Sequence, residues 1–442
     1  MNPTIAAGAG DLPPAIVTPP PGPGSRRLSE RIAAAEAPGI NTLTGERPSL
    51  FWEQAIGANV VDVDGNRFVD LTSGFGVAAV GHRHPRVVAA IAEQADRLLH
   101  GLGDVHPHLP RLELAERLAL RAPVAAGAQG ARVHFGISGA EAVEIAVKTA
   151  LLVTGRPVVV AFEPAYHGLT AGALALSSRP AFRRPFAPHL HPYVARLPFA
   201  GDPAAVEARL AVGDVAAVVV EPVVGREGVL LPPAGWLPAV AETCRRHGSL
   251  LVADEVFTGF GRTGRWFAVE HEAVRPDLLV LGKALGGGLP IAAVVGSAET
   301  MAAWAVEGEA LHTATFVANP LACAGALAVL DVLAEERLVE RAARLGDRLA
   351  DRLAVWPGRF PAVRDVRGRG LLQGIELASR AAAARFVSAA AARGVLLLAG
   401  GPAGRVVQIV PPLTVAEEQL AAALDLLEES LRAVGKATDG PP

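Results

Sequence analysis

The chain has 442 residues, of which 51% are hydrophobic, and its formal net charge at pH 7 is −3. A charge this small argues against a general binder of nucleic acids or anionic membranes. The sequence contains no run of about eighteen uninterrupted apolar residues, so we expect no membrane span. Two cysteines, Cys244 and Cys323, offer neither a disulfide framework nor the spacing of a metal site, and they indicate a reduced, cytoplasmic setting.

The first 25 residues are rich in proline and glycine and lack the basic region and apolar core of a signal peptide. They predict a flexible tail over residues 1–25. Residues 26–80 form a mixed segment that we expect to contribute to a small domain. Within it, residues 59–71 are typical of a β-hairpin with its turn at Asp64-Gly65.

Helical and strand-like patterns alternate from residue 81 to residue 325. Residues 84–99 have the apolar spacing of a helix, and six short apolar runs rich in β-branched residues follow. These runs occupy residues 131–135, 157–162, 216–222, 249–254, 277–282 and 292–296. Continuous apolar strands between helices predict an α/β fold with a mostly parallel sheet covered on both faces.

Residues 326–436 have a different pattern, which begins with a long amphipathic helix and closes with another helix. Between them, residues 369–377, 394–400 and 405–412 are strand-like. This region predicts a second, smaller α+β domain.

Polar residues gather where the apolar strands end, and ligands of open α/β sheets bind beyond the carboxyl ends of the strands. Gly139 and Ala140 follow the first of these runs and begin a helix. Its free N–H groups favour an anion such as phosphate, although the same residues also suit an ordinary strand-to-helix turn. Tyr166, beside His167, offers an aromatic face to a planar ring, or it is a half-buried loop aromatic.

Two carboxylates follow further strands of the same sheet. Glu221 and Asp254 each come at the end of an apolar run, where a carboxylate is costly unless it is paired or in use. Residues 259–264 match the dinucleotide pattern G-x-G-x-x-G, but they do not join a strand directly to a helix. We therefore do not expect a nicotinamide or flavin site.

Lys283 is one of only three lysines in a chain whose positive charge is otherwise supplied by arginine. It ends a buried strand, and Gly286, Gly287 and Gly288 then let the backbone approach a ligand closely. Apolar surroundings destabilise an ammonium and so favour the nucleophilic neutral amine. Combined with the acid, the helix start and the aromatic residue, this lysine indicates a pyridoxal 5'-phosphate site.

Over about residues 47–430 the chain resembles the class III, or ornithine/acetylornithine/ω-amino-acid type, pyridoxal-phosphate-dependent aminotransferases of fold type I. The matching motifs are residues 64–70, 81–85, 138–142, 166–168, 221–222, 254–256, 259–264, Lys283 with 286–290, 312–316 with 319–320, and 367–370. The resemblance implies a large cofactor-binding domain over residues 81–325 and a C-terminal small domain over residues 326–436.

The resemblance also implies a role for each matching residue. Lys283 would form the internal aldimine and then move the Cα proton, and Asp254 would pair with the pyridine nitrogen. The expected cofactor-binding set is Ser138, Gly139, Ala140, Tyr166, His167, Glu221, Asp254, Val256, Lys283 and Thr315. In that set Thr315 would reach the phosphate of the neighbouring subunit's cofactor, which implies a homodimer.

The substrate positions depart from relatives that act on γ-aminobutyrate, ornithine or acetylornithine. Leu169 and Gln408 stand where those relatives have arginines, and Arg226 stands where they have a glutamate. The change removes two carboxylate clamps, and Arg226 either supplies one from another direction or faces solvent. Phe257 replaces a glutamine that contacts the cofactor in many relatives, and the segment around Phe75 would form an apolar wall of the substrate pocket.

The resulting hypothesis is an aminotransferase that moves an amino group from an amine or amino acid to an oxo acid, aldehyde or ketone by ping-pong chemistry. A racemase or epimerase on the same scaffold is the main alternative, because loss of the two arginines suits an enzyme with a single substrate. An aminomutase and a non-catalytic binding protein are further alternatives. No metal, nucleic-acid partner or membrane partner is expected.

Overall fold

The computed structural model describes residues 10–40 and 49–436, which divide into two compact units. Unit 1 comprises Met1–His84, Asp351–Val366 and Gln373–Pro442, and unit 2 comprises Pro85–Ala350 and Arg367–Leu372. The expected boundary at residue 325 is therefore displaced. Helix α11 (Pro320–Glu335) belongs to unit 2 because it packs against α3 (Pro85–Arg97) and α4 (Leu109–Arg121) of that unit.

Unit 2 is built on a seven-stranded sheet with the order β4-β10-β9-β8-β7-β5-β6. Its strands are β4 (Ala131–Gly136), β5 (Val158–Glu163), β6 (Val194–Pro198), β7 (Val215–Val220), β8 (Leu250–Asp254), β9 (Leu278–Leu281) and β10 (Ala292–Ser297). The six predicted strands are confirmed. Strand β6 was not predicted, because Arg196 and Pro198 interrupt its apolar pattern.

Strand β10 runs antiparallel to both of its neighbours, β4 and β9, whereas neighbouring strands from β9 to β6 pair in parallel. The sheet is thus mostly parallel, as expected, but the antiparallel direction of β10 was not predicted. The cause is the short connection over residues 282–291, which holds only the 3-10 turn η3 (Lys283–Gly286). A parallel return needs a crossover of about a dozen residues or more.

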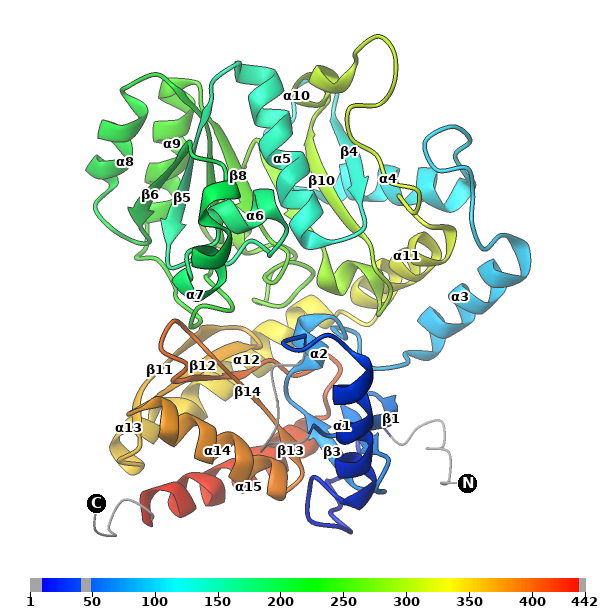
Figure 1. The fold of residues 1–442 in the computed structure, drawn as a ribbon, viewed down its shortest axis with the longest axis vertical. Coiled ribbons are helices and arrows are strands. Elements are labelled where there is room, and N and C mark those ends of the chain that lie inside the picture. Colours follow the sequence, from blue (N-terminus) through cyan, green and yellow to red (C-terminus); the bar gives the residue numbers. More distant parts are fainter. Residues whose placement is uncertain (1–9, 41–48, 437–442) are drawn as a thin grey trace. The chain divides into compact units, whose positions relative to one another are not determined.

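Helices cover the sheet of unit 2 (Figure 1). Helix α5 (Gly139–Thr154) packs on the sheet and buries Val143, Ile145 and Ala146 in a core cluster that includes residues of strands β5, β7, β8, β9 and β10. The other helices of unit 2 are α6 (Ala171–Leu176), α7 (Pro180–Arg183), α8 (Pro203–Leu210), α9 (Trp236–His247), α10 (Ala298–Met301) and most of α12 (Leu338–Ala354), with 3-10 turns at η1 (Arg184–His189), η2 (Ala268–Glu272) and η4 (Ala302–Trp304).

Unit 1 contains a four-stranded sheet of β1 (Trp52–Ile56), β2 (Asn59–Asp62), β3 (Arg67–Asp70) and β13 (Val395–Leu396). The predicted hairpin over residues 59–71 is confirmed, because β2 and β3 pair antiparallel. Gly65 makes its turn at φ +83°, with its N–H bonded to the carbonyl of Asp62.

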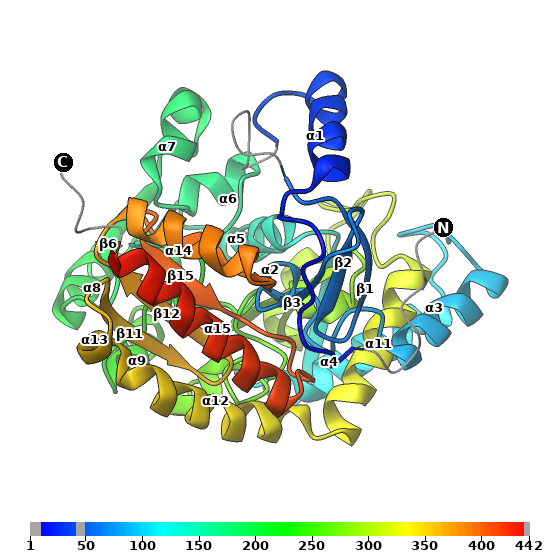
Figure 2. The ribbon, with the colours of Figure 1, turned by 90° about the horizontal axis from the view of Figure 1, so that it is seen from below.

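A second four-stranded sheet lies mainly in unit 1, with the order β11 (Val363–Arg369), β12 (Leu372–Leu377), β15 (Val406–Ile409) and β14 (Leu398–Gly400). Helices α14 (Arg380–Ala392) and α15 (Glu417–Lys436) lie side by side (Figure 2). The remaining helices of unit 1 are α1 (Pro23–Ala35), α2 (Ser73–Gly76) and α13 (Trp356–Arg359). This mixture agrees with the α+β prediction for the smaller part of the chain.

The expectation of a flexible tail is wrong for residues 10–25, and residues 1–9 lie outside the described part. The N–H of Leu12 donates to Oδ1 of Asn59 at 2.9 Å, and Nδ2 of Asn59 returns a bond to the carbonyl of Leu12 at 3.0 Å. Ala15 pairs with Arg67, and helix α1 begins at Pro23. The composition concealed these bonds because the partners lie about 50 residues away along the chain.

Within residues 10–40 and 49–436, no helix is both long enough and apolar enough to cross a membrane. The same residues contain no cluster of three or more His, Cys, Asp or Glu side chains arranged to hold a metal ion.

Candidate active site

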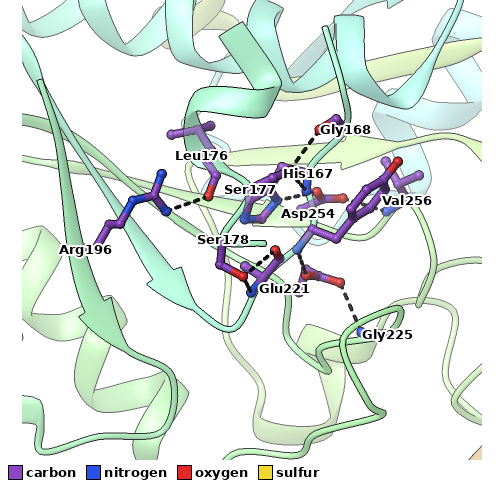
Figure 3. A network of polar contacts seen from close by, with 12 residues as sticks. His167, Gly168, Leu176, Ser177, Ser178, Arg196, Glu221, Gly225, Asp254 and Val256 are labelled. Carbon is purple, nitrogen blue, oxygen red and sulfur yellow. Dashed lines mark hydrogen bonds and ion pairs between the residues drawn. The ribbon is translucent and has the colours of Figure 1, made fainter. Parts of the chain in front are cut away.

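Asp254 ends strand β8, and its carboxylate is buried in unit 2. One oxygen, Oδ2, lies 2.7 Å from Nδ1 of His167, and the other accepts the N–H of Val256 at 3.1 Å (Figure 3). A carboxylate oxygen has two lone pairs, so these bonds leave acceptor capacity on Asp254. The strand end thus presents a fixed, partly satisfied carboxylate.

His167 lies in the loop after β5, where both its backbone and its ring make hydrogen bonds. Its N–H donates to Oγ of Ser177 at 2.9 Å, and that hydroxyl donates to the carbonyl of Gly168. Burial alone would lower the pKa of His167, but the hydrogen bond and charge of Asp254 outweigh burial and raise it. Nε2 of His167 is buried without a hydrogen-bond partner among the described residues.

Glu221 follows strand β7 and joins two loops (Figure 3). Its carboxylate accepts the N–H of Tyr166 at 2.8 Å and the N–H of Gly225 at 3.0 Å. Burial raises the pKa of Glu221 to about 7, Asp254 adds to this effect, and His167 opposes it. Glu221 therefore fixes the backbone of Tyr166 and changes its charge near neutral pH.

Lys283 begins η3, directly after strand β9, with a φ of +42°. This conformation is strained for a residue with a side chain, which is common at functional sites. Burial lowers the pKa of Lys283 and Arg226 lowers it further, whereas Asp254 and Glu221 oppose the shift. Its Nζ lies 4.6 Å from the centre of the Phe257 ring, so the amine rests on an apolar face.

Helix α5 starts at Gly139 with Ser138 as its N-cap, and Oγ of Ser138 accepts the N–H of Glu141 at 3.2 Å. The N–H groups of Gly139 and Ala140 have no recorded acceptor among the described residues. Gly139 also packs closely on Val256, because a Cβ at this position would lie 2.9 Å from Cγ1 of Val256. The helix start thus offers two amide donors beside the valine.

These groups fit pyridoxal 5'-phosphate by their chemistry. Amides at a helix N-terminus suit a phosphate, and a carboxylate suits a protonated pyridine nitrogen. A lysine whose pKa is lowered suits the aldehyde carbon.

Most of the predicted cofactor residues therefore come together in unit 2. Contacts or electrostatic effects join Gly139 to Val256, Val256 to Asp254, Asp254 to His167 and Lys283, and Tyr166 to Glu221. Thr315 is exposed in the segment before α11, near Gly103.

The four predicted substrate positions are divided between the units. Leu169 is exposed in unit 2, and Arg226 is half-buried there. Phe75 and Gln408 belong to unit 1, where Phe75 is 65% exposed with φ +62° and Gln408 lies in β15.

Sequence reasoning missed Ser177 and Phe182. Ser177 holds the His167 loop, and the Phe182 ring lies 6.4 Å from that of Tyr166 in an edge-to-face arrangement. No local pattern signals either residue, because both act through contacts made by the folded chain. Only the order of the motifs around residues 166–168 pointed toward this region.

Comparison with known proteins gives a consistent result. The family described as class-III aminotransferases matches residues 43–431. An acetylornithine aminotransferase from Methanopyrus kandleri is 42% identical over 379 residues, which cover 86% of this chain and 93% of that protein. A 4-aminobutyrate aminotransferase from Mycobacterium bovis is 37% identical over 443 residues, which cover 93% of this chain and 96% of that protein.

Solved structures agree with these relatives. The ornithine aminotransferase from Toxoplasma gondii, with pyridoxal phosphate at partial occupancy in its active site, has a TM-score of 0.85 at 33% identity. The alignment covers 93% of this chain and 96% of that chain. An amine transaminase from an uncultivated Pseudomonas species in its pyridoxal-phosphate-bound form has a TM-score of 0.82 at 29% identity, and the alignment covers 90% of this chain and 99% of that one.

Proposed function

The chain belongs to the class-III aminotransferase family, and we propose that Lys283 and Asp254 carry its chemistry at the ends of the adjacent strands β9 and β8. The expected fold type I architecture and the use of pyridoxal phosphate are confirmed by the family and by its solved neighbours. These relatives are aminotransferases, so the racemase alternative is not favoured.

The observation that carries the proposal is the position of Lys283 at the end of β9, where its Nζ lies 4.6 Å from the centre of the Phe257 ring. Burial there lowers the pKa of Lys283, although the charges of Asp254 and Glu221 act in the opposite direction. A lysine amine that loses its proton easily can act as a nucleophile and can later accept and return a proton at the substrate Cα. Asp254 would hold a proton on the pyridine nitrogen, and His167 would keep the carboxylate in place for this task. When bound, pyridoxal phosphate supplies an electron sink for the substrate carbon.

The remaining residues would bind and orient the cofactor. Gly139 and Ala140 would donate to its phosphate, with Ser138 capping the same helix. Val256 and Tyr166 would contact the cofactor ring, since their backbone N–H groups donate to Asp254 and Glu221 and so hold both residues at the site. Phe257 stands in place of a donor to the phenolic oxygen, so this contact would be absent here.

The proposed reaction transfers an amino group from an amine or amino acid to an oxo acid, aldehyde or ketone. The test mixes purified holoenzyme with one amino donor and no acceptor and follows the cofactor spectrum. Conversion to the pyridoxamine form with stoichiometric oxo product supports transamination. Retention of the starting spectrum together with solvent deuterium at Cα would support an isomerase and reject the proposal.

A second measurement tests Lys283 itself. Borohydride treatment should fix the pyridoxyl group on this lysine, and peptide mass spectrometry would locate it. A Lys283→Arg variant is the matched control, because it keeps the charge and loses the reactive amine. A label at Lys148 would contradict the assignment.

We also propose a homodimer that works in the cytoplasm. The segments at 98–112 and 311–316 expose many large apolar side chains, and the rings of His100 and Phe316, one from each segment, lie 5.3 Å apart. The exposed residues are Leu98, Leu99, Leu102, Val105, Leu109, Leu112, Leu311 and Phe316. A face of this kind marks a protein interface. Analytical ultracentrifugation of the unchanged protein should give a molar mass of two chains. The Leu112→Glu variant should give the molar mass of one chain.

A further inference from the structure

Arg226 is held by aromatic rings. Its guanidinium carbon lies 4.3 Å from the centre of the Tyr166 ring and 5.4 Å from the centre of the Phe182 ring. Guanidinium groups stack on aromatic faces, and the stacking leaves the N–H donors at the edge of the plane available. This arrangement excludes the simple alternative of a freely solvated arginine.

The nearby carboxylates already have other partners. Glu227, the next residue, is buried and accepts two bonds from Nη2 of Arg179, at 2.8 and 2.9 Å. Glu221 accepts the N–H groups of Tyr166 and Gly225. Among the described residues, the side chain of Arg226 makes no hydrogen bond or ion pair, so its five N–H donors remain available beside the two rings.

Arg226 is close enough to Lys283 for its charge to affect the reactive amine. Tyr166, on which Arg226 stacks, is tied through its backbone to Glu221, and the charge of Arg226 acts on Lys283. A half-buried guanidinium with free edge donors is suited to a planar anion that accepts two parallel hydrogen bonds, which is the geometry of a carboxylate. Leu169, the other predicted substrate position in unit 2, has no side-chain donor to offer.

We propose that Arg226 binds the carboxylate of the substrate, so that this enzyme selects amino donors and oxo acceptors that carry a carboxylate over uncharged analogues. The inference rests on the proposed aminotransferase function and names its specificity-determining residue. Tyr166 and Phe182 position the guanidinium. The carboxylate of Glu227, the next residue, is bound by Arg179 and so does not pair with Arg226.

The test compares Arg226→Met and Arg226→Lys with the unchanged enzyme. Arg184→Met is the matched control, because Arg184 is an exposed arginine on the neighbouring turn η1. Each variant receives a panel of amino acids and the corresponding carboxamides, which differ only in the charged group. For Arg226→Met, kcat/KM should fall by about 100-fold more for the best amino acid than for its carboxamide, since any effect of the lost charge on Lys283 is common to both substrates.

The Arg226→Lys variant should retain part of this preference, since an ammonium keeps the charge but not the two-pronged geometry. Arg184→Met should behave as the unchanged enzyme. An equal loss on acids and carboxamides in Arg226→Met, or an unchanged preference for acids, would overturn the proposal. Circular dichroism and thermal unfolding establish that each variant is folded.

Binding without turnover separates this inference from the proposed function. Pentanoate, a carboxylate without an amino group, is titrated into each holoenzyme by calorimetry. Its affinity should fall by about 100-fold in Arg226→Met and remain in Arg184→Met. If no donor changes the cofactor in the unchanged enzyme, the proposed function fails, and the pentanoate titration still decides whether Arg226 is the carboxylate site.

Discussion

Nδ1 of His167 lies 2.7 Å from Oδ2 of Asp254, and both side chains are buried in unit 2. The loop after β5 therefore supplies a hydrogen-bonding imidazole to the acidic side chain at the end of β8. Without His167, the buried carboxyl group of Asp254 would keep only the N–H of Val256 as a hydrogen-bond donor, and burying a polar group with fewer partners is costly. The two residues act as a unit, since His167 sets the orientation of Asp254.

Removing the donor should weaken cofactor binding. His167→Phe is expected to raise the Kd for pyridoxal phosphate by roughly 10- to 100-fold, because a hydrogen bond to a charged group is lost. His167→Asn, whose amide N–H can donate to Asp254, should show a smaller change. The measurement is an absorbance titration of the apo-enzyme, and equal affinities in the two variants would argue against the role of the hydrogen bond.

Gly168 lies where a side chain does not fit. Its φ is +128°, and a Cβ would lie 2.5 Å from Cβ of Ala140. Gly168→Ala should destabilise the protein by roughly 2–5 kcal/mol, from backbone strain and overpacking together. The control is Gly213→Ala, since Gly213 has a φ of +84° and nothing within 4 Å of its would-be Cβ.

The control should lose only about 1–2 kcal/mol, the cost of the backbone conformation alone. Urea unfolding measures both variants. Equal losses would show that the contact with Ala140 relaxes. Because Ala140 lies at the proposed phosphate site, Gly168→Ala should also weaken cofactor binding, whereas Gly213→Ala should not.

Glu255 makes stability depend on pH. It is fully buried, Oε1 accepts the N–H of Val269 at 2.8 Å and Oε2 accepts the hydroxyl of Thr258. Burial raises the pKa of Glu255 to about 7, above its ordinary 4.5. The folded state therefore holds the proton more tightly than the unfolded chain, so the stabilisation is complete below pH 4.5 and is lost as pH rises through 7.

Glu255→Gln should remove this dependence, because the amide does not ionise: its oxygen can accept the N–H of Val269 while its NH2 group donates to the hydroxyl of Thr258. The difference in unfolding free energy between the variant and the unchanged protein should grow by a few kcal/mol, about 3 at most, from pH 5 to pH 8.5. Urea titrations at both pH values measure it. A difference that stays constant over that range would refute the assignment to Glu255.

Arg156 connects three parts of unit 2. Its Nη1 donates to the carbonyls of Val215, His247 and Gly248, at 3.1, 2.9 and 3.0 Å. Arg156→Met should destabilise the protein by about 1–2 kcal/mol, because these acceptors lose a charged donor. The control is Arg97→Met, which removes an exposed i,i+4 ion pair with Glu93 and should leave the thermal midpoint unchanged. Equal midpoints in the two variants would contradict the prediction.

Much of the fold was predictable from the sequence, and most of the proposed cofactor site could be proposed from it, because their signals are local. Strands β4, β5, β7, β8, β9 and β10 are short apolar runs, and a buried strand needs such a run whatever its partners are. The motifs around Asp254 and Lys283 lie directly at strand ends, where the order of elements already points to a shared edge.

Other features depended on long-range contacts. The carbonyl and amide groups of residues 12–18 find partners in Asn59 and Asn66, which reverses the expectation of a flexible tail. Helix α11 joins unit 2 because of its packing on α3 and α4, which no local pattern reveals. In each case the deciding energy comes from a surface or bond formed between distant segments.

By itself, the sequence determined the kind of chemistry, because the residue types and the order of Lys283, Asp254 and the helix start at Gly139 indicate a pyridoxal phosphate enzyme. Only the tertiary structure decided where Arg226 points. Its stacking on Tyr166 and Phe182, and the occupation of Glu227 by Arg179, arise from segments more than 40 residues apart. A side chain's charge is a property of its residue, but the partners left for that charge are a property of the fold.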